Sequence, residues 1–564
     1  MKIKALIQMF ALAVPFMLTA CDDEIEVNIP EVAAPALVST TPENNASRVR
    51  RGDITITVTY DKNVFFATSN TDQLQFTGGT ITSANVIGSS NTLTVNVNVP
   101  TRETQCTLTI PAGVVTGPND MPAPAVTVQF STIGLDEALV NASATSEAVE
   151  LYNYLLENSE TRTLSAIMAD VDWNTDEAEQ VFQWTGKYPA INCFDYLHLN
   201  SSPANWIDYN DITPVKDWWD AGGIVAAMWH WNVPTSNTAT LSADETVIRD
   251  WNALSLTSAE AKALFAKAEV GDKVTVNITY VGTDAQGSFK DGASWTGLVD
   301  EAGTSYEYFD VEKDATSFSL TLDATTLAAV QANGLIISGH KYTITSVILE
   351  GVPSETYNFY AENNAFDPAN ALTEGTWEND VYEADMAEII SYLTLLQNEG
   401  IPVLWRPYHE AAGGWFWWGK DAASFKALWV DMFNRFQAAG LNNLIWVWTS
   451  ETGDDDWYPG DAYVDIIGRD LYGNAAADCA SQYNTLAATY GNKMVALSEC
   501  GYGESTSSTV GLISEQWAAG ARWAWFMPWY NGDDASTFHA DEAWWKDAME
   551  QEFVISRDEL PARQ

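Results

Sequence analysis

One unit of helix followed by strand decides the fold class, and its sequence is MAEIISYLTLLQNEGIPVLWRPYHE at residues 386–410. Apolar residues recur at spacings of three and four from Met386 to Leu396, the period of an amphipathic helix, and Gly400 ends that helix. The following run, residues 401–410, has the composition of a buried strand. Helices that alternate with buried strands are typical of a parallel α/β fold.

The same unit recurs along the C-terminal part of the chain. Eight buried strands are predicted, at residues 164–171, 188–199, 223–231, 401–410, 444–449, 464–472, 494–499 and 521–529. Eight strand–helix units predict a TIM (β/α)8 barrel. The third and fourth strands are separated by the segment from Pro234 to Ile401, far longer than the roughly 30 residues that one unit needs. We therefore expect a domain inserted after barrel strand 3.

Two segments alternate polar and apolar residues with a period of two, the pattern of half-buried strands. One is residues 37–132 and the other is residues 237–355, which fills the gap between barrel strands 3 and 4. Each predicts a β-sandwich. The barrel is then expected from residues 140–235 and 357–564.

The overall charge excludes one class of ligand. The 564 residues include 27 Lys and Arg against 76 Asp and Glu, a net charge of −49. Such a surface repels phosphate backbones, so we expect no nucleic-acid partner. The 24 Trp residues point to flat ligands that stack or, alternatively, to large cores.

The N-terminal residues resemble a targeting signal. Two lysines precede the apolar run Ala5–Leu18, and residues 18–21, LTAC, match a bacterial lipobox whose Cys21 is lipidated. The acidic residues 22–24 resemble the surface-export signal of Bacteroidetes lipoproteins, or else begin a solvated tether that continues as a linker to residue 36. No other apolar run approaches the roughly 20 residues of a membrane span. We expect an outer-membrane lipoprotein at the cell surface that meets the membrane only through Cys21.

Two glutamates end predicted barrel strands. Glu410 ends strand four in WRPYHEAAGGWFWWG, residues 405–419, and Glu499 ends strand seven in VALSECG, residues 495–501. Since TIM-barrel active sites lie at the carboxyl ends of the strands, both side chains are expected over one barrel mouth. Either glutamate alone is more simply a salt-bridged loop residue. Together, beside a cluster of tryptophans, they predict the paired carboxylates of a glycosidase.

These motifs resemble glycoside hydrolase family 26, chiefly β-mannanases, over residues 140–235 and 357–564. The family places His before its catalytic acid/base, as His409 stands here, and Trp229–Asn232 and Asp465–Tyr472 resemble other family segments. Residues 37–132 resemble bacterial Ig-like domains, with a spacer or a binding role left open. Residues 237–355 resemble sandwich modules of carbohydrate-binding type, with binding or scaffolding equally open.

The resemblance implies roles for individual residues. Glu410 is the expected acid/base and Glu499 the nucleophile, which Tyr472 hydrogen-bonds. Burial by Trp415, Trp417 and Trp418 should raise the pKa of Glu410, as a general acid requires. Arg406 shares strand parity with Glu410 and is expected to help keep Glu499 anionic. The expected substrate-binding residues are His230, His409, Trp415, Tyr472 and Trp529, and the supporting residues are Arg406 and Asp470.

The sequence thus predicts a retaining endo-β-1,4-mannanase that hydrolyses mannan, glucomannan or galactomannan by double displacement. Other activities of the family remain alternatives: β-1,3-1,4-glucanase, β-1,3-xylanase or exo-acting mannobiohydrolase. A non-catalytic surface glycan-binding lipoprotein is the alternative from another class. No metal or cofactor is implied, and the four remaining cysteines are too few and scattered to predict a disulfide framework or a zinc site.

Overall fold

A computed structural model describes residues 32–199, 202–532 and 538–562. The chain forms two compact units, the first ending at Ser131 and the second comprising Thr132 onward together with residues 50–52 and 101–103. The predicted leader and Cys21 lie outside the described residues. Among those that are described, no helix has both the length and the apolar character needed to cross a membrane.

The N-terminal strands form two antiparallel four-stranded sheets, as their alternation predicts. One sheet has the order β1 (Leu37–Thr41), β3 (Gly52–Tyr60), β6 (Thr92–Val99) and β5 (Thr80–Asn85). The other has the order β2 (Ala46–Val49), β8 (Val126–Thr132), β7 (Gln105–Ile110) and β4 (Gln75–Thr77). Alternate residues of β6, such as Val95 and Val97, are fully buried in a core that draws on both sheets.

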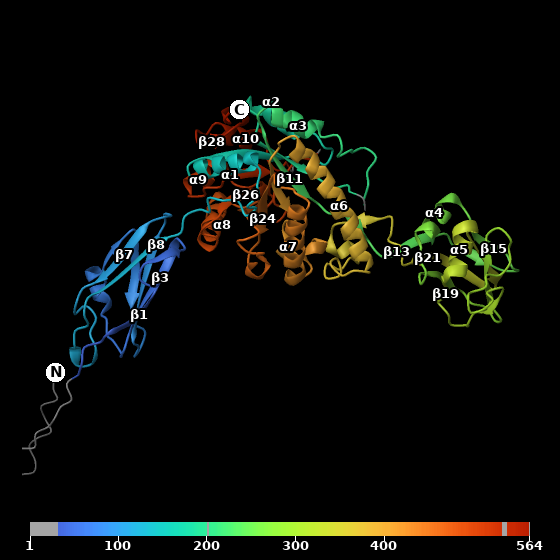
Figure 1. The fold of residues 1–564 in the computed structure, drawn as a ribbon, viewed down its shortest axis with the longest axis horizontal. Coiled ribbons are helices and arrows are strands. Elements are labelled where there is room, and N and C mark those ends of the chain that lie inside the picture. The colour runs from blue at the N-terminus through green and yellow to red at the C-terminus, as the bar shows by residue number, and fades with distance from the viewer. Residues whose placement is uncertain (1–31, 200–201, 533–537, 563–564) are drawn as a thin grey trace, which may run out of the picture. The chain divides into compact units, whose positions relative to one another are not determined.

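The second unit contains the predicted TIM barrel. Within the described residues, eight parallel strands close because β9 pairs with both β10 and β27. The strands are β9 (Thr163–Met168), β10 (Ile191–Asp195), β11 (Ile224–Trp229), β23 (Val403–Pro407), β24 (Leu444–Ser450), β25 (Ile466–Tyr472), β26 (Met494–Gly501) and β27 (Trp525–Pro528). Figure 1 shows helices packed around these strands. They are α1 (Ser146–Asn158), α2 (Asp176–Thr185), α3 (Thr213–Asp220), α6 (Trp377–Asn398), α7 (Ala422–Ala438), α8 (Ala476–Thr489), α9 (Ile513–Ala518) and α10 (Glu542–Met549).

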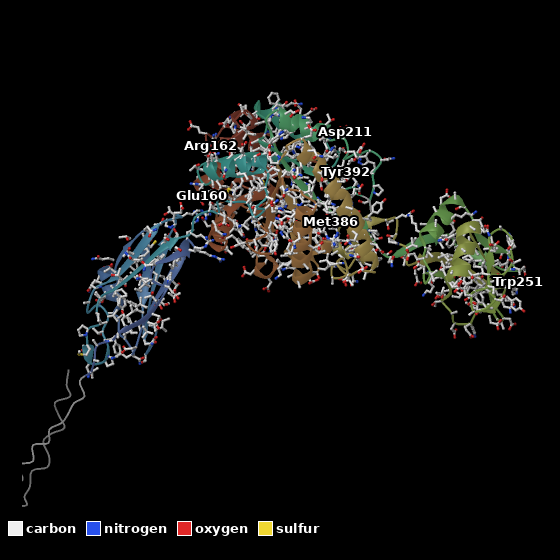
Figure 2. The ribbon with its side chains drawn as sticks, viewed as in Figure 1. Glu160, Arg162, Asp211, Trp251, Met386 and Tyr392 are labelled. Atoms are coloured by element: carbon white, nitrogen blue, oxygen red, sulfur yellow. The ribbon has the colours of Figure 1, made fainter. Side chains whose placement is uncertain are left out.

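Side-chain alternation divides the core of the barrel into two layers. Leu404 belongs to the inner cluster, whereas Val403 and Trp405 join the cluster between strands and helices. Met386 of α6, labelled in Figure 2, is buried in that outer cluster. Arg406 has the parity of Leu404, so its side chain enters the barrel interior as predicted.

Several predicted strands are shorter than expected, and the shortening of the fourth affects the site. The apolar run 401–410 ends as a strand at Pro407, so Glu410 lies on the loop that follows β23. Proline removes a backbone donor, which favours the end of the strand there. In a strand that continued to residue 410, the His409 side chain would point away from the face that carries Arg406 and Glu410, but β23 ends before His409 and this alternation does not apply.

The segment between β11 and β23 builds sheets of its own. A five-stranded sheet contains β13 (Thr238–Ser242), β14 (Thr246–Ile248), β16 (Lys273–Thr279), β19 (Ser317–Thr321) and β21 (Tyr342–Glu350). A four-stranded sheet contains β15 (Ala253–Leu256), β17 (Gln286–Asp291), β18 (Phe309–Asp310) and β20 (Leu335–His340). Two helices that the alternation did not predict, α4 (Ala259–Lys267) and α5 (Ala324–Asn333), share the core of these sheets. The short strands β12 (Val233–Pro234) and β22 (Tyr357–Asn358) pair where the chain leaves and rejoins the barrel.

Candidate active site

The loop after β23 carries Glu410 in an unusual conformation. Tyr408 and Glu410 have φ values of 49° and 50°, in the left-handed region that non-glycine residues rarely adopt. Such backbone strain is concentrated at functional sites. Trp415 follows on the same loop, and its indole Nε1 donates a hydrogen bond of 3.0 Å to Glu410 Oε2.

Glu499 is buried in β26, and each of its carboxylate oxygens accepts a hydrogen bond. The Tyr472 hydroxyl, at the end of β25, donates to Oε2 at 2.7 Å. Arg406 of β23 donates to Oε1 through Nη2. A positive charge and a hydroxyl donor on one carboxylate both favour its ionised form. The contacts predicted for Arg406 and Tyr472 are therefore present.

Arg406 also joins Glu499 to Asp470. Its Nη1 donates to Asp470 Oδ2 at 3.0 Å and to Thr449 Oγ1 at 2.9 Å. The second oxygen of Asp470 accepts from the Ser498 hydroxyl at 2.7 Å. Asp470, predicted as a supporting residue, thus holds the guanidinium that faces Glu499.

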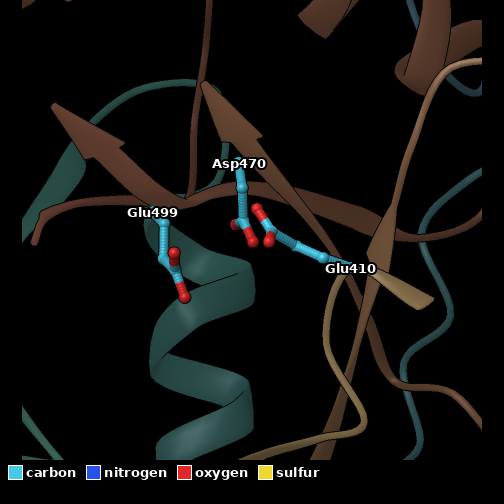
Figure 3. Close-up of side chains that lie close together, drawn as sticks. All are labelled: Glu410, Asp470 and Glu499. Carbon is cyan, nitrogen blue, oxygen red and sulfur yellow. The ribbon is translucent and has the colours of Figure 1, made fainter. Parts of the chain in front are cut away.

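Three carboxylates meet at the mouth of the barrel. Oxygen atoms of Glu410, Asp470 and Glu499 all lie within 4.8 Å of one another, and Figure 3 shows the three side chains converging. Arg406 contacts Asp470 and Glu499 but is not hydrogen-bonded to Glu410. The charges of the first two are thus compensated directly, and Glu410 is the carboxyl left to hold a proton.

Burial and neighbouring charges give Glu410 the character of an acid. Burial, followed by the negative charges of Asp470 and Glu451, raises the pKa of Glu410 to about 9. This direction agrees with the expectation, but the three tryptophans expected around the carboxyl group do not all contact it. Trp417 and Trp418 are fully buried and donate to the backbone oxygens of Trp231 and His409. They support the loop, and Trp415 alone of the three hydrogen-bonds the carboxyl group.

The two predicted histidines lie together. The centroids of the His230 and His409 rings are 4.4 Å apart. His409 Nε2 is 4.0 Å from Glu499 Oε1. Burial, with the charges of His230 and Arg406, holds the pKa of His409 well below its usual range, so its ring is neutral. Its Nδ1 is buried and has no hydrogen-bond partner among the described residues. His409 faces Glu499 because the strand ends before it.

The two tryptophans predicted to bind substrate each contact one group of the site. Trp415 keeps 42% of its surface exposed beside the carboxyl group of Glu410. Trp529 follows β27 directly, and its ring centroid is 5.5 Å from that of His230.

The sequence reasoning missed two acidic residues. Asp195 ends β10; its Oδ2 lies 2.7 Å from His230 Nδ1 and its Oδ1 accepts from the His230 backbone N–H at 3.0 Å. Glu451 follows β24, and burial raises its pKa to about 7. The rule that identified Glu410 and Glu499, a carboxylate at the end of a barrel strand, points to Glu451. Asp195 lay inside the predicted strand 188–199, and only the structure shows that this strand ends at Asp195.

Comparisons with known proteins agree with this geometry. The family model described as "Glycosyl hydrolase family 26" matches residues 140–280 and 343–559, and the model "Bacterial Ig-like domain" matches residues 31–132. The second match confirms the predicted resemblance of the N-terminal strands.

Curated relatives and solved structures extend the comparison. "Mannan endo-1,4-beta-mannosidase A" of Piromyces sp is 34% identical over 208 residues, 36% of this chain and 33% of the relative. "Mannan endo-1,4-beta-mannosidase" of Thermothelomyces thermophilus is 36% identical over 211 residues, 36% of this chain and 41% of the relative. The chain therefore spans well under half of these relatives. The crystal structure of the GH26 domain of a Prevotella bryantii endo-beta-mannanase/endo-beta-glucanase is 33% identical, with a TM-score of 0.52 over 76% of this chain and 100% of that one.

Proposed function

This chain belongs to glycosyl hydrolase family 26, and from that membership we propose that it hydrolyses β-1,4-linked mannans, internally and with retention of configuration. The observation that carries the proposal is the pair Glu410 and Glu499. One carboxylate oxygen of each lies within 4.8 Å of one of the other, which fits the roughly 5 Å spacing of retaining enzymes better than the 6.5–9.5 Å or so of inverting ones. The closer spacing leaves no room for a water molecule between the carboxylate and the sugar.

The first half of the reaction breaks the glycosidic bond. Glu410 gives its proton to the departing oxygen, while Glu499 attacks the anomeric carbon and forms a covalent glycosyl–enzyme. The raised pKa of Glu410 keeps that proton in place at neutral pH. Arg406 and Tyr472 stabilise the anionic carboxylate of Glu499 before the attack.

The second half releases the sugar. Glu410, now a carboxylate, takes a proton from water, and the resulting nucleophile attacks the anomeric carbon and displaces Glu499. At the end of the reaction Glu410 is again protonated and Glu499 is again ionised, as they were at the start. Two inversions give net retention.

Trp415 is suited to the departing side of the substrate, because its indole hydrogen-bonds the acid itself. His230 packs against both His409 and Trp529, and His409 lies beside Glu499, so the three are suited to the sugar that becomes attached to Glu499. Asp195 fixes the His230 ring by its hydrogen bond to Nδ1.

Mannan is the proposed substrate because the curated relatives are named mannan endo-1,4-β-mannosidases. Product analysis on β-1,4-mannan, mixed-linked β-glucan and β-1,3-xylan tests this. We expect oligosaccharides of several lengths from mannan. Release of disaccharide alone would indicate exo action, and preferential cleavage of either other polymer would overturn the assignment. An absence of cleavage on all three would favour a glycan-binding protein.

For location, we propose a lipoprotein of the outer membrane, exposed at the cell surface and anchored through Cys21. The LTAC sequence at residues 18–21 and the acidic residues after it support this proposal. Labelled fatty acid should enter the wild-type chain and not the Cys21→Ala variant. Protease added to intact cells should remove the anchored protein, and resistance to that protease would place it on the inner face.

A further inference from the structure

Two exposed aromatic residues of the insert, Trp251 and Tyr280, have left-handed backbone. Trp251 has φ 63° and is 43% exposed, and Tyr280 has φ 46° and is 79% exposed. Figure 2 labels Trp251 at the surface of the insert. Bulky residues are genuine outliers in this region, so the surrounding structure must hold them there. We call these two residues the aromatic pair.

Hydrogen bonds tie the backbone at or near each member of the aromatic pair to residues 339–341, where β20 ends and Lys341 connects it to β21. The Trp251 backbone N–H donates to Gly339 O at 2.9 Å. Two residues after Tyr280, the Gly282 N–H donates to Lys341 O at 2.8 Å. Lys341 itself has φ 65°. The two aromatic residues therefore lie at the same end of the insert, although 29 positions separate them in sequence.

Polar groups surround this end of the insert. The Asp250 N–H donates to His340 Nδ1 at 3.1 Å, while the Asp250 carboxylate is mostly free to solvent. Lys341 Nζ donates to Thr283 O at 3.0 Å. Flat, rigid aromatic faces beside a carboxylate, an imidazole and an ammonium offer both stacking and hydrogen bonds.

We propose that the aromatic pair is a carbohydrate-binding site that holds a β-linked hexopyranose chain, the same polymer that the barrel cleaves. The choice of mannan as ligand rests on the proposed function. A pyranose suits the site because its C–H face stacks on an aromatic ring while its hydroxyl edge meets the polar groups. The chain's net charge of −49 disfavours anionic polymers, and a neutral polysaccharide escapes that repulsion.

Such a site would raise the effective concentration of the polymer at the barrel. A second point of attachment on the same polypeptide keeps the barrel near an insoluble polymer after each cleavage, and linked sites gain about 10²- to 10⁴-fold in avidity. A short soluble oligosaccharide gains nothing from it. The aromatic pair should therefore matter for polymer and not for oligosaccharide.

The insert supplies a matched control. Trp295 is also exposed, at 52%, with φ 61°, but its N–H donates to Asp291 O. Asp291 pairs with Leu335, whereas Gln286, at the other end of β17, pairs with His340. Trp295 thus stands at the end of these strands away from the aromatic pair.

The test compares the full-length Trp251→Ala/Tyr280→Ala and Trp295→Ala variants. Binding to insoluble β-1,4-mannan is measured in a Glu499→Gln background, and hydrolysis of mannohexaose in the otherwise wild-type chain. We expect the double variant to bind insoluble mannan at least about tenfold more weakly. Its hydrolysis of mannohexaose should stay within about twofold of wild type, and Trp295→Ala should match its parent in both assays.

Unchanged binding by the double variant would overturn the proposal, and so would an equal loss in Trp295→Ala. Failure of the parent to bind mannan would overturn it as well. A wild-type chain that binds mannan through the aromatic pair but leaves mannohexaose intact would contradict the proposed function alone. The two assays therefore separate the two proposals.

Discussion

The Tyr472 hydroxyl donates a hydrogen bond of 2.7 Å to Glu499 Oε2, joining the end of β25 to its neighbour β26. Burial, with the charges of Asp470 and Glu410, holds the pKa of Tyr472 well above its usual range, so the hydroxyl keeps its proton. The donor therefore remains available to the nucleophile at any working pH.

Tyr472→Phe removes this donor and keeps the ring. Hydrogen bonds to charged groups contribute about 1.5–3 kcal/mol, so we expect kcat/KM on mannohexaose to fall about 10- to 100-fold. Steady-state kinetics measures the loss, and the thermal midpoint checks the fold. Wild-type kinetics in a folded variant would show that the bond plays no part in catalysis.

The two glutamates should respond differently to azide. Glu410→Ala lacks the proton donor and should lose mannan hydrolysis, yet it should still form the glycosyl–enzyme from an activated aryl mannoside. Azide needs no general base, so it should restore turnover and give a β-mannosyl azide.

Glu499→Ala provides the opposite case. Without a nucleophile, azide enters in one displacement, so any product should be the α-mannosyl azide. NMR of the products distinguishes the anomers. A β-azide from Glu499→Ala, or near-normal mannan hydrolysis by either variant, would reverse or remove the assigned roles.

The high-pH limb of the kcat/KM profile, where activity is lost as the pH rises, should depend on Glu451. Glu410 must be protonated to act, so activity is present below its pKa and is lost as the pH rises through it. The negative charge of Glu451 raises that pKa, whose value in the resting chain is about 9. Glu451→Gln should therefore move the high-pH limb of kcat/KM to lower pH, and the exposed Glu504→Gln should leave it in place. A limb that does not move would show that Glu451 is too well screened to influence the acid.

Chelation should leave activity intact. The carboxylates of Asp470 and Glu499 are compensated by the Arg406 guanidinium, and the proposed mechanism assigns every step to a side chain or water. We expect the same mannan hydrolysis before and after dialysis against a chelator. Loss of activity that a divalent cation restores would contradict the two-carboxylate mechanism.

Excision of residues 237–355 should leave a folded barrel. Pairing of Val233 with Asn358, and a hydrogen bond of 2.8 Å from the Thr235 N–H to Thr356 O, hold the two cut ends together, so a short linker can join them. Thermal unfolding and mannohexaose hydrolysis by the shortened chain measure the outcome. Aggregation of that chain would show that the insert is required for the barrel to fold.

Much of the site follows from local sequence. Apolar strands buried on both faces, alternating with amphipathic helices, determine the barrel, and parallel strands place their carboxyl ends at one mouth. Glu410 and Glu499 could therefore be paired across 89 positions without a structure. The period of two also placed Arg406 inside the barrel, because that residue lies within β23.

Tertiary structure decided what lies beyond the strand ends. Side-chain alternation holds only while the backbone is extended, and β23 ends at Pro407; the left-handed Tyr408 and Glu410 then turn His409 toward Glu499. The bond between Asp195 and His230 joins neighbouring strands and depends on their register. The pKa of Glu410 depends on burial in the folded barrel and on the charges of Asp470 in β25 and Glu451 after β24. Sequence determined which residues reach the mouth, whereas the folded barrel determined which of them touch, because those contacts are made between strands far apart in the chain.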